Sequence, residues 1–182
     1  MPHPPAPWHL NGELVVVPAL TSARQLGGVM LANYTAGTLV YRELIVFSHA
    51  TARGMVVSHI YVDSEQSMSG GHEIWQLPKE LAEFEYGDRT FTARQGETTL
   101  LHAKLRRRRG GLPILIPTPI FSAAGQTIGR ARIKAAPALV DLQIPHDSPF
   151  AYLGLAGRHV ALAGDDLRLH MPEPRVRETL AP

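Results

Sequence analysis

The sequence predicts a mainly β protein, built as an antiparallel sheet or barrel. Two observations support this fold class: short segments rich in Val, Ile, Leu and Thr recur along the chain, and glycine-containing turn signals separate them. We expect strands over residues 13–18, 38–48, 55–63, 90–94, 98–106, 114–121, 127–134, 138–144 and 158–170. Helices are expected only over residues 21–26 and 78–84, the second opened by Pro78, whose fixed φ suits a first helical turn.

The length of 182 residues fits one domain spanning 1–182, with residues 1–12 and 173–182 as tails. Cysteine is absent, which excludes disulfide bonds and thiolate metal sites. The nine histidines lack the spacing of metal ligands, so no metal is expected. No window approaches the roughly 20 apolar residues of a membrane span and no signal peptide is recognisable, so we expect a cytoplasmic protein without membrane contact.

The charge pattern does not indicate a nucleic-acid partner. The formal net charge is only +2, and the most basic segment is the arginine run at residues 106–109, followed by Gly110 and Gly111. No aromatic residues are interleaved with these arginines to stack on bases. We therefore interpret the run as a solvated hairpin tip.

Lys79 is the strongest candidate for covalent chemistry. In the run at residues 70–81 it lies between an apolar, strand-like segment and a helix start, and the other two lysines are Lys104 and Lys134. A desolvated amine is a nucleophile, and arginine cannot replace it because guanidinium does not lose its proton. The alternative is a solvated residue in the first turn of a short helix.

Glu43 is a carboxylate on an apolar strand face. Alternation within residues 39–47 places it with Leu39, Tyr41, Ile45 and Phe47. An isolated carboxylate on such a face is costly unless it is protonated, paired or functional. Pairing with an arginine, such as Arg42 of a neighbouring copy or Arg130, is the structural alternative.

Several motifs together resemble the acetoacetate decarboxylase family. They are, in order, Tyr41-Arg42-Glu43, Arg53-Gly54, Tyr61-Val62-Asp63, Gly71-His72-Glu73 and Leu77-Pro78-Lys79-Glu80-Leu81. The similarity is strong over residues 37–82 and weaker afterwards, where Ser148-Pro149-Phe150 and Leu153 occupy the usual late region. The resemblance implies a β sheet closed into a barrel or cone with a few short helices, no cofactor, and a homo-oligomer.

The same resemblance implies a Schiff-base site. Lys79 corresponds to the family's nucleophile, which forms an imine with a ketone and so promotes loss of carbon dioxide; the family is a standard example of an activated lysine. Glu43 corresponds to the glutamate that orients the imine and handles protons. The remaining expected pocket residues are His72, Glu73 and Leu77, together with His59 and Tyr61, which alternation places on one strand face with Met55 and Val57. Glu80 stands where the family often has a second lysine, and we expect it to face solvent.

Two further departures affect the expected substrate. The family's early arginine and first active-site glutamate fall near Gly12 and Gly28, where Arg24 and Glu13 are the nearby substitutes. The leading hypothesis is a cofactor-free decarboxylase of a small β-keto acid. An aldolase or dehydratase using the same imine is the alternative, because a substrate without a β-carboxylate has no need of that arginine. A noncatalytic binder of small ligands is the third possibility.

Overall fold

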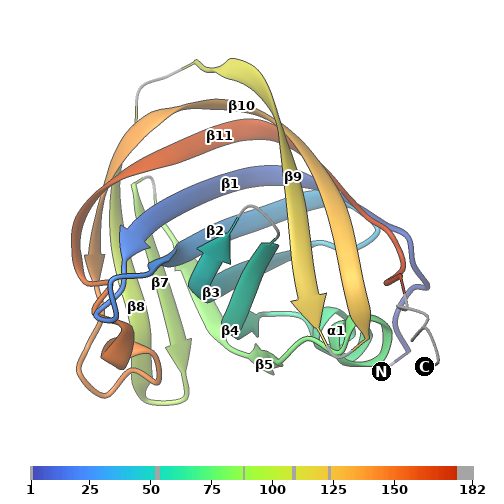
Figure 1. Cartoon of the computed structure of the whole chain (residues 1–182), viewed down its shortest axis with the longest axis horizontal. Coiled ribbons are helices and arrows are strands. Elements are labelled where there is room, and N and C mark those ends of the chain that lie inside the picture. Colours follow the sequence, from blue (N-terminus) through green and yellow to red (C-terminus); the bar gives the residue numbers. More distant parts are fainter. Residues whose placement is uncertain (1, 52–53, 88, 108–109, 123, 176–182) are drawn as a thin grey trace, which may run out of the picture.

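The computed structural model describes residues 2–51, 54–87, 89–107, 110–122 and 124–175, with residues 107 and 121 described by backbone only (Figure 1). This part of the chain is mainly β, as the sequence predicts, with one α-helix. The elements are β1 (Trp8–Leu20), β2 (Leu26–Gly37), β3 (Tyr41–Thr51), β4 (Gly54–Val62), α1 (Glu65–Trp75), β5 (Lys79–Leu81), β6 (Glu83–Tyr86), β7 (Thr90–Gln95), β8 (Thr98–Arg107), β9 (Leu112–Ser122), β10 (Gly125–Gln143), a short 3₁₀ helix (Ala151–Leu153) and β11 (Gly157–Met171). Within the described ranges, no helix combines the length and apolar character needed to cross a membrane.

The sheet closes into a ring. Hydrogen-bonded neighbours run in the order β11, β1, β2, β3, β4, β9, β10, and β10 pairs in turn with β11. In Figure 1 the long strands β1, β10 and β11 curve together over one side of the molecule. The contact between β4 and β9 is a parallel bridge between Met55 and Ile120, whereas the other ring pairings are antiparallel. Strands β8, β7 and β6 extend the sheet beyond β10.

β10 contributes to two hydrophobic cores on opposite faces of the sheet. Ala131 and Ile133 belong to the first core, whereas Val140 and Leu142 belong to the second. The alternation changes phase at Ala135 and Ala136, which are both buried. This phase change makes the sequence look like two strands, over 127–134 and 138–144, although the backbone pairs with β11 without a break between them.

The N-terminal region differs from the sequence-based expectation. Residues 8–12, expected in a tail, begin β1, and Trp8 is buried. Residues 21–26 were expected as a helix, but residues 21–25 form the β1–β2 turn and Leu26 begins β2; in the turn the Thr21 N–H donates to the Gln25 carbonyl at 2.9 Å. β2 was not expected because its glycines are weak strand formers. At Gly28 a Cβ atom would lie 2.1 Å from the Val17 carbonyl oxygen, so close strand approach requires glycine there.

The helix near Lys79 precedes that residue, and the expected helix at residues 78–84 is wrong. α1 begins at the N-cap Ser64, whose hydroxyl accepts from the Ser67 N–H, while residues 79–81 and 83–86 are strands. The sequence hides α1 because Gly70 and Gly71 are poor helix formers and because Gln76, rather than the usual glycine, adopts the left-handed conformation at its C-terminus.

Parts of four expected features lie outside the described residues: residue 1 of the N-terminal tail, residue 53 of the Arg53-Gly54 motif, arginines 108 and 109 of the basic run, and residues 176–182 of the C-terminal tail. Residue 175 is described, and its backbone pairs with Gln126.

Candidate active site

The C-terminal turn of α1 directs Lys79 into the protein. Gln76 has a φ of 49°, and its N–H donates to the His72 carbonyl at 3.2 Å, which is the hydrogen bond of a left-handed C-cap, while the Leu77 N–H donates to the Gly71 carbonyl at 3.0 Å. β5 then runs parallel to β4, with Lys79 opposite Ile60. As a result the Lys79 side chain is only 5% exposed.

Two glycines of α1 make room for the site. A Cβ atom on Gly71 would lie 2.4 Å from Cδ of Lys79, and one on Gly70 would lie 2.5 Å from Cζ2 of Trp8. Both distances are far below ordinary van der Waals contact. The helix backbone therefore packs directly against the stem of the lysine and the indole ring, which explains why this helix tolerates adjacent glycines.

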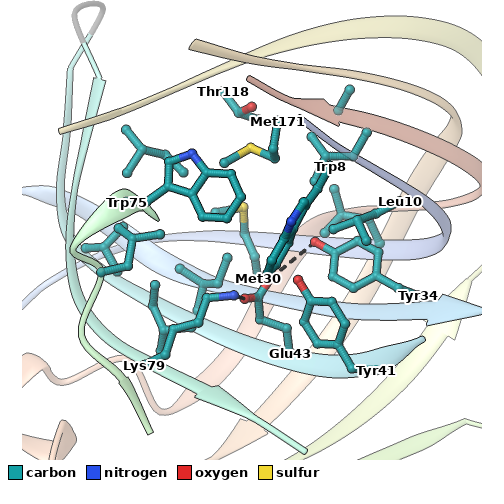
Figure 2. Close-up of a pocket in the computed structure, with 18 of the residues that line it drawn as sticks. Trp8, Leu10, Met30, Tyr34, Tyr41, Glu43, Trp75, Lys79, Thr118 and Met171 are labelled. Atoms are coloured by element: carbon teal, nitrogen blue, oxygen red, sulfur yellow. Dashed lines mark hydrogen bonds and ion pairs between the residues drawn. The ribbon is translucent and has the colours of Figure 1, made fainter. Parts of the chain in front are cut away.

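Lys79 and Glu43 form a buried ion pair. Nζ of Lys79 lies 2.7 Å from Oε1 of Glu43, and both side chains are 5% exposed. The same Nζ donates to the Ser67 hydroxyl at 3.0 Å. It also lies 5.9 Å from the ring centre of Trp8 and 5.2 Å from that of Tyr41. Figure 2 shows the two charged groups facing each other at one end of the cavity.

Two tyrosines complete the polar part of the site. The hydroxyl of Tyr34 donates to Oε2 of Glu43 at 3.2 Å. Burial, reinforced by the negative charge of Glu43, raises the pKa of Tyr34 and of Tyr41 well above the usual value. Both hydroxyls therefore keep their protons at neutral pH, and Tyr34 can only donate to the carboxylate.

A small apolar cavity adjoins the ion pair. Its volume is about 70 Å³, roughly half of an engineered cavity of about 150 Å³ that binds benzene. Lys79 and Glu43 are the only charged residues among its described lining residues. The lining comprises Trp8, Leu10, Leu14, Met30, Tyr34, Tyr41, Glu43, Ile45, Met55, Val57, Ile60, Trp75, Leu77, Lys79, Thr118, Ile120, Ala131, Leu167, Leu169 and Met171.

The strand face that carries Glu43 is the one that alternation predicts. Its four apolar neighbours on that face, Leu39, Tyr41, Ile45 and Phe47, all belong to or pack against the same core cluster. The arginine pairing considered for Glu43 is not what the described residues show. Arg42 instead pairs with Asp63 at 3.2 Å, and Glu43 pairs with Lys79.

His59 and Tyr61 lie on the opposite face of β4 from the cavity, because two bulges interrupt the pairing with β3. His59 is opposite Val46 and Val57 is opposite Phe47, so Ser58 is an extra residue on β4. The extra residue shifts the alternation by one position. Met55, Val57 and Ile60 therefore line the cavity, whereas Tyr61 joins the other core.

His72 and Glu73 also lie outside the cavity lining, on the exposed side of α1. Nε2 of His72 donates to the Lys79 backbone carbonyl at 2.7 Å, which supports the backbone of the lysine. Glu73 accepts from His3 and Ser69. Glu80 is exposed because neighbouring strand residues point to opposite faces, and it accepts from Gln95.

Leu77 lines the cavity, as expected. Glu13 and Arg24, the nearby substitutes for the family's early charged residues, do not line it. At Gly12 a Cβ atom would lie 1.9 Å from the Asn33 carbonyl oxygen, so close packing of the strands leaves no room for a side chain at this position.

Four residues of the site carried no signal in the sequence. Trp8 and Tyr34 are aromatic residues without a recognisable motif, Ser67 belongs to the helix that was not expected, and Thr118 belongs to a strand far along the chain. Only the fold brings them to Lys79 and Glu43. A serine one helical turn before a glycine pair is the sole local hint for Ser67, and it is too common to be useful.

The fold and the site define a closed β sheet that holds a buried amine–carboxylate pair beside a small apolar cavity. The family model described as acetoacetate decarboxylase (ADC) matches residues 14–116, more than half of the chain, and the chain therefore belongs to the acetoacetate decarboxylase family. No curated protein matches the chain.

Solved structures show the same fold. The acetoacetate decarboxylase of Legionella pneumophila subsp. pneumophila str. Philadelphia 1 is 16% identical with a TM-score of 0.67, covering 100% of this chain and 91% of that one. The enduracididine biosynthesis enzyme MppR is 11% identical with a TM-score of 0.66, and the match covers 98% of this chain and 90% of that one. An acetoacetate decarboxylase-like enzyme from Sphingomonas wittichii RW1 is 12% identical with a TM-score of 0.55, and the match covers 93% of this chain and 92% of that one.

Proposed function

We propose that the protein is an imine-forming enzyme that makes or breaks carbon–carbon bonds of small carbonyl compounds, with Lys79 as nucleophile. The observation that carries the proposal is the Lys79–Glu43 contact of 2.7 Å inside an apolar cavity. Family membership supports the same chemistry. A purely structural ion pair has no need of an adjoining cavity, whereas a noncatalytic binder of small ligands does, so the reactivity of the Lys79 amine separates the enzyme from that binder.

Glu43 supplies the proton acceptor that activates the amine. Transfer of one proton from the Lys79 ammonium to the Glu43 carboxylate yields a free amine and a carboxylic acid, and the cavity stays neutral throughout. Because neither state adds net charge to the apolar cavity, the transfer avoids the cost of burying an unpaired ion. Tyr34 holds Oε2 of Glu43, so that Oε1 remains directed at the amine.

The chemical steps follow from these positions. The amine adds to the substrate carbonyl, and the Glu43 acid protonates the departing hydroxyl, so that water leaves and an iminium ion remains. With a β-keto acid, the electron pair of the bond to the carboxylate carbon moves into the iminium, releasing carbon dioxide and an enamine. A proton returned to the enamine carbon, followed by hydrolysis, frees the ketone and the lysine.

Aldol-type bond formation or dehydration is the second candidate reaction. The same enamine attacks an aldehyde instead of taking up a proton. One observation favours it: the described cavity lining holds no cation besides Lys79 to bind a substrate carboxylate. The structural neighbour MppR has also been solved with the condensation product of pyruvate and imidazole 4-carboxaldehyde.

We further propose that the protein forms a homo-oligomer. Leu139 on β10 lies opposite Val160 on β11, and Pro137 lies opposite Leu162. The side chains of Leu139, Val160 and Leu162 are 57%, 68% and 42% exposed, so they form a contiguous apolar surface. Light scattering after size exclusion tests this, and Leu139→Glu is expected to shift the protein towards the monomer.

Borohydride trapping tests the imine. The protein is incubated with small ketones, keto acids and aldehydes near neutral pH, reduced, digested and analysed by mass spectrometry. We expect a stable adduct at Lys79 and much less at Lys104 and Lys134. Equal labelling of all three lysines, or no adduct, would contradict the proposed function.

A further inference from the structure

We infer that the substrate of this site is an uncharged carbonyl compound that carries a neutral hydrogen-bonding group at the end remote from Lys79, where the Thr118 hydroxyl contacts it. This inference rests on the proposed imine chemistry and specifies its substrate class. It is carried by the charge balance of the cavity and by one unpartnered polar atom.

The charge balance is set by a single pair of opposite charges. Among the described lining residues, the positive group is Lys79 and the negative group is Glu43, and they neutralise each other at 2.7 Å. An uncharged carbonyl compound preserves this balance, because the iminium ion forms as Glu43 gives up its proton and becomes a carboxylate. Water leaves with the carbonyl oxygen, and no net charge is added.

A substrate carboxylate breaks the balance. It would add a second negative charge to an apolar cavity whose only described cation already pairs with Glu43. Burying an unpaired ion is strongly unfavourable. The other polar groups around the cavity offer little compensation, since Trp8 and Trp75 donate their indole N–H groups to the carbonyls of Pro4 and Pro172.

Thr118 is the exception among these polar groups. Its Oγ1 atom is buried and has no hydrogen-bond partner, although the residue lines the cavity. Figure 2 shows Thr118 beside Met171, on the opposite side of the drawn residues from Lys79. A buried hydroxyl without a partner costs free energy, which a bound hydroxyl or carbonyl group of the substrate would recover.

Gly129 makes room for the Thr118 hydroxyl at this end of the cavity. A Cβ atom on Gly129, the strand partner of Thr118, would lie 2.4 Å from Oγ1 and 2.8 Å from Sδ of Met171. The far end of the cavity thus presents one hydroxyl within an otherwise apolar surface. A neutral polar group fits this environment, whereas a carboxylate does not.

The reaction that this substrate class allows is aldol-type cleavage or formation. In a β-hydroxy ketone that carries its remote polar group beyond the β-hydroxyl, the iminium accepts the electron pair of the carbon–carbon bond, and the β-hydroxyl proton passes to the Glu43 carboxylate. An aldehyde and an enamine result, with every atom retained. The reverse sequence forms the bond.

Three ketones of similar size and different terminal groups test the inference. They are 2-pentanone, 4-hydroxy-2-butanone and acetoacetate, which end in a methyl, a hydroxyl and a carboxylate group. Each is trapped on the whole protein with borohydride, all Lys79 adduct masses from one compound are summed, and the rates are divided by those of a free lysine derivative under the same conditions.

We expect both neutral ketones to label Lys79 at least about a hundredfold faster than acetoacetate, given the cost of burying an unpaired ion. Equal or faster labelling by acetoacetate would overturn the inference and leave the imine function intact. Absence of Lys79 adducts with all three compounds would instead overturn the proposed function itself.

Two variants test the Thr118 contact. Thr118→Val removes the hydroxyl at nearly constant shape and is expected to reduce labelling by 4-hydroxy-2-butanone about three- to tenfold relative to 2-pentanone, the worth of one hydrogen bond. Thr118→Ser keeps the hydroxyl and is expected to retain the wild-type ratio. A parallel change for both ketones, or no change in their ratio, would show that Thr118 does not contact the substrate.

Discussion

Replacing Gly71 with alanine should disable Lys79 without unfolding the protein. The new Cβ atom would lie 2.4 Å from Cδ of Lys79 and 2.9 Å from both Cγ and Cε, whereas ordinary contact begins at 3.4 Å. The lysine stem and the helix must therefore separate by about 1 Å. The ammonium group is held at 2.7 Å from Glu43, so the displacement breaks the alignment for proton transfer.

A misplacement of about 1 Å can reduce the rate of a positioned reaction about a hundredfold. Stability should change less, because alanine gains up to about 1 kcal/mol of helix propensity over glycine, which offsets part of the strain. The assay is the rate of borohydride trapping at Lys79 with a ketone that the wild-type protein accepts, together with a thermal melt. Ser69→Ala, on the exposed side of the same helix, is the matched control and should behave like the wild type.

The result that would refute this reasoning is a Gly71→Ala protein that traps the ketone at the wild-type rate with an unchanged pH profile. The position of Lys79 would then not depend on its packing against α1. A protein that no longer melts cooperatively would show instead that the strain is relieved by moving the helix, and circular dichroism would detect that change.

Three further outcomes can be measured. Glu43→Gln preserves the shape of the side chain but cannot accept the proton of Lys79, so the trapping rate should fall about a hundredfold; a rate near that of the wild type would remove Glu43 from the mechanism. Trp8→Ala removes a side chain that is 1% exposed, leaves a cavity and should lower the free energy of unfolding by about 3–5 kcal/mol. A thermal melt should show a clearly lower midpoint, with Trp8→Phe between Trp8→Ala and the wild type. Hydrogen bonds to the Pro4 carbonyl and to Glu73 raise the pKa of His3 above 6.5. The His3–Glu73 contact therefore stabilises the fold at low pH, and this stabilisation is lost as the pH rises through the pKa of His3. NMR titration should show the raised pKa, and Glu73→Gln should lower the pKa of His3.

The sequence predicted much of the fold because β strands carry their own pattern. Most expected strands appear near their predicted positions, since alternation and turn residues are local properties. The errors arose where local preference and tertiary context disagree. β2 contains glycines that close strand packing requires, and α1 contains two glycines that make room for Lys79 and Trp8.

The candidate site divides in the same way. Lys79 and Glu43 were identifiable because a motif and an apolar strand face single them out, and the structure brings them within 2.7 Å. His59 and Tyr61 were expected beside them from simple alternation. The extra residue Ser58 in β4 reverses that alternation, and no feature of the sequence signals a bulge there.

The sequence by itself therefore determined the β class, the family resemblance and the two residues most suited to covalent chemistry, because these depend on composition, periodicity and short motifs. Only the tertiary structure decided which residues surround them. Closing the sheet brings β1, β2, β9 and α1 together around the cavity, and that places Trp8, Tyr34, Thr118 and Ser67 near residues far away in the chain. Such contacts depend on strand order and on single bulges, which are cooperative properties of the whole sheet and leave no local trace in the sequence.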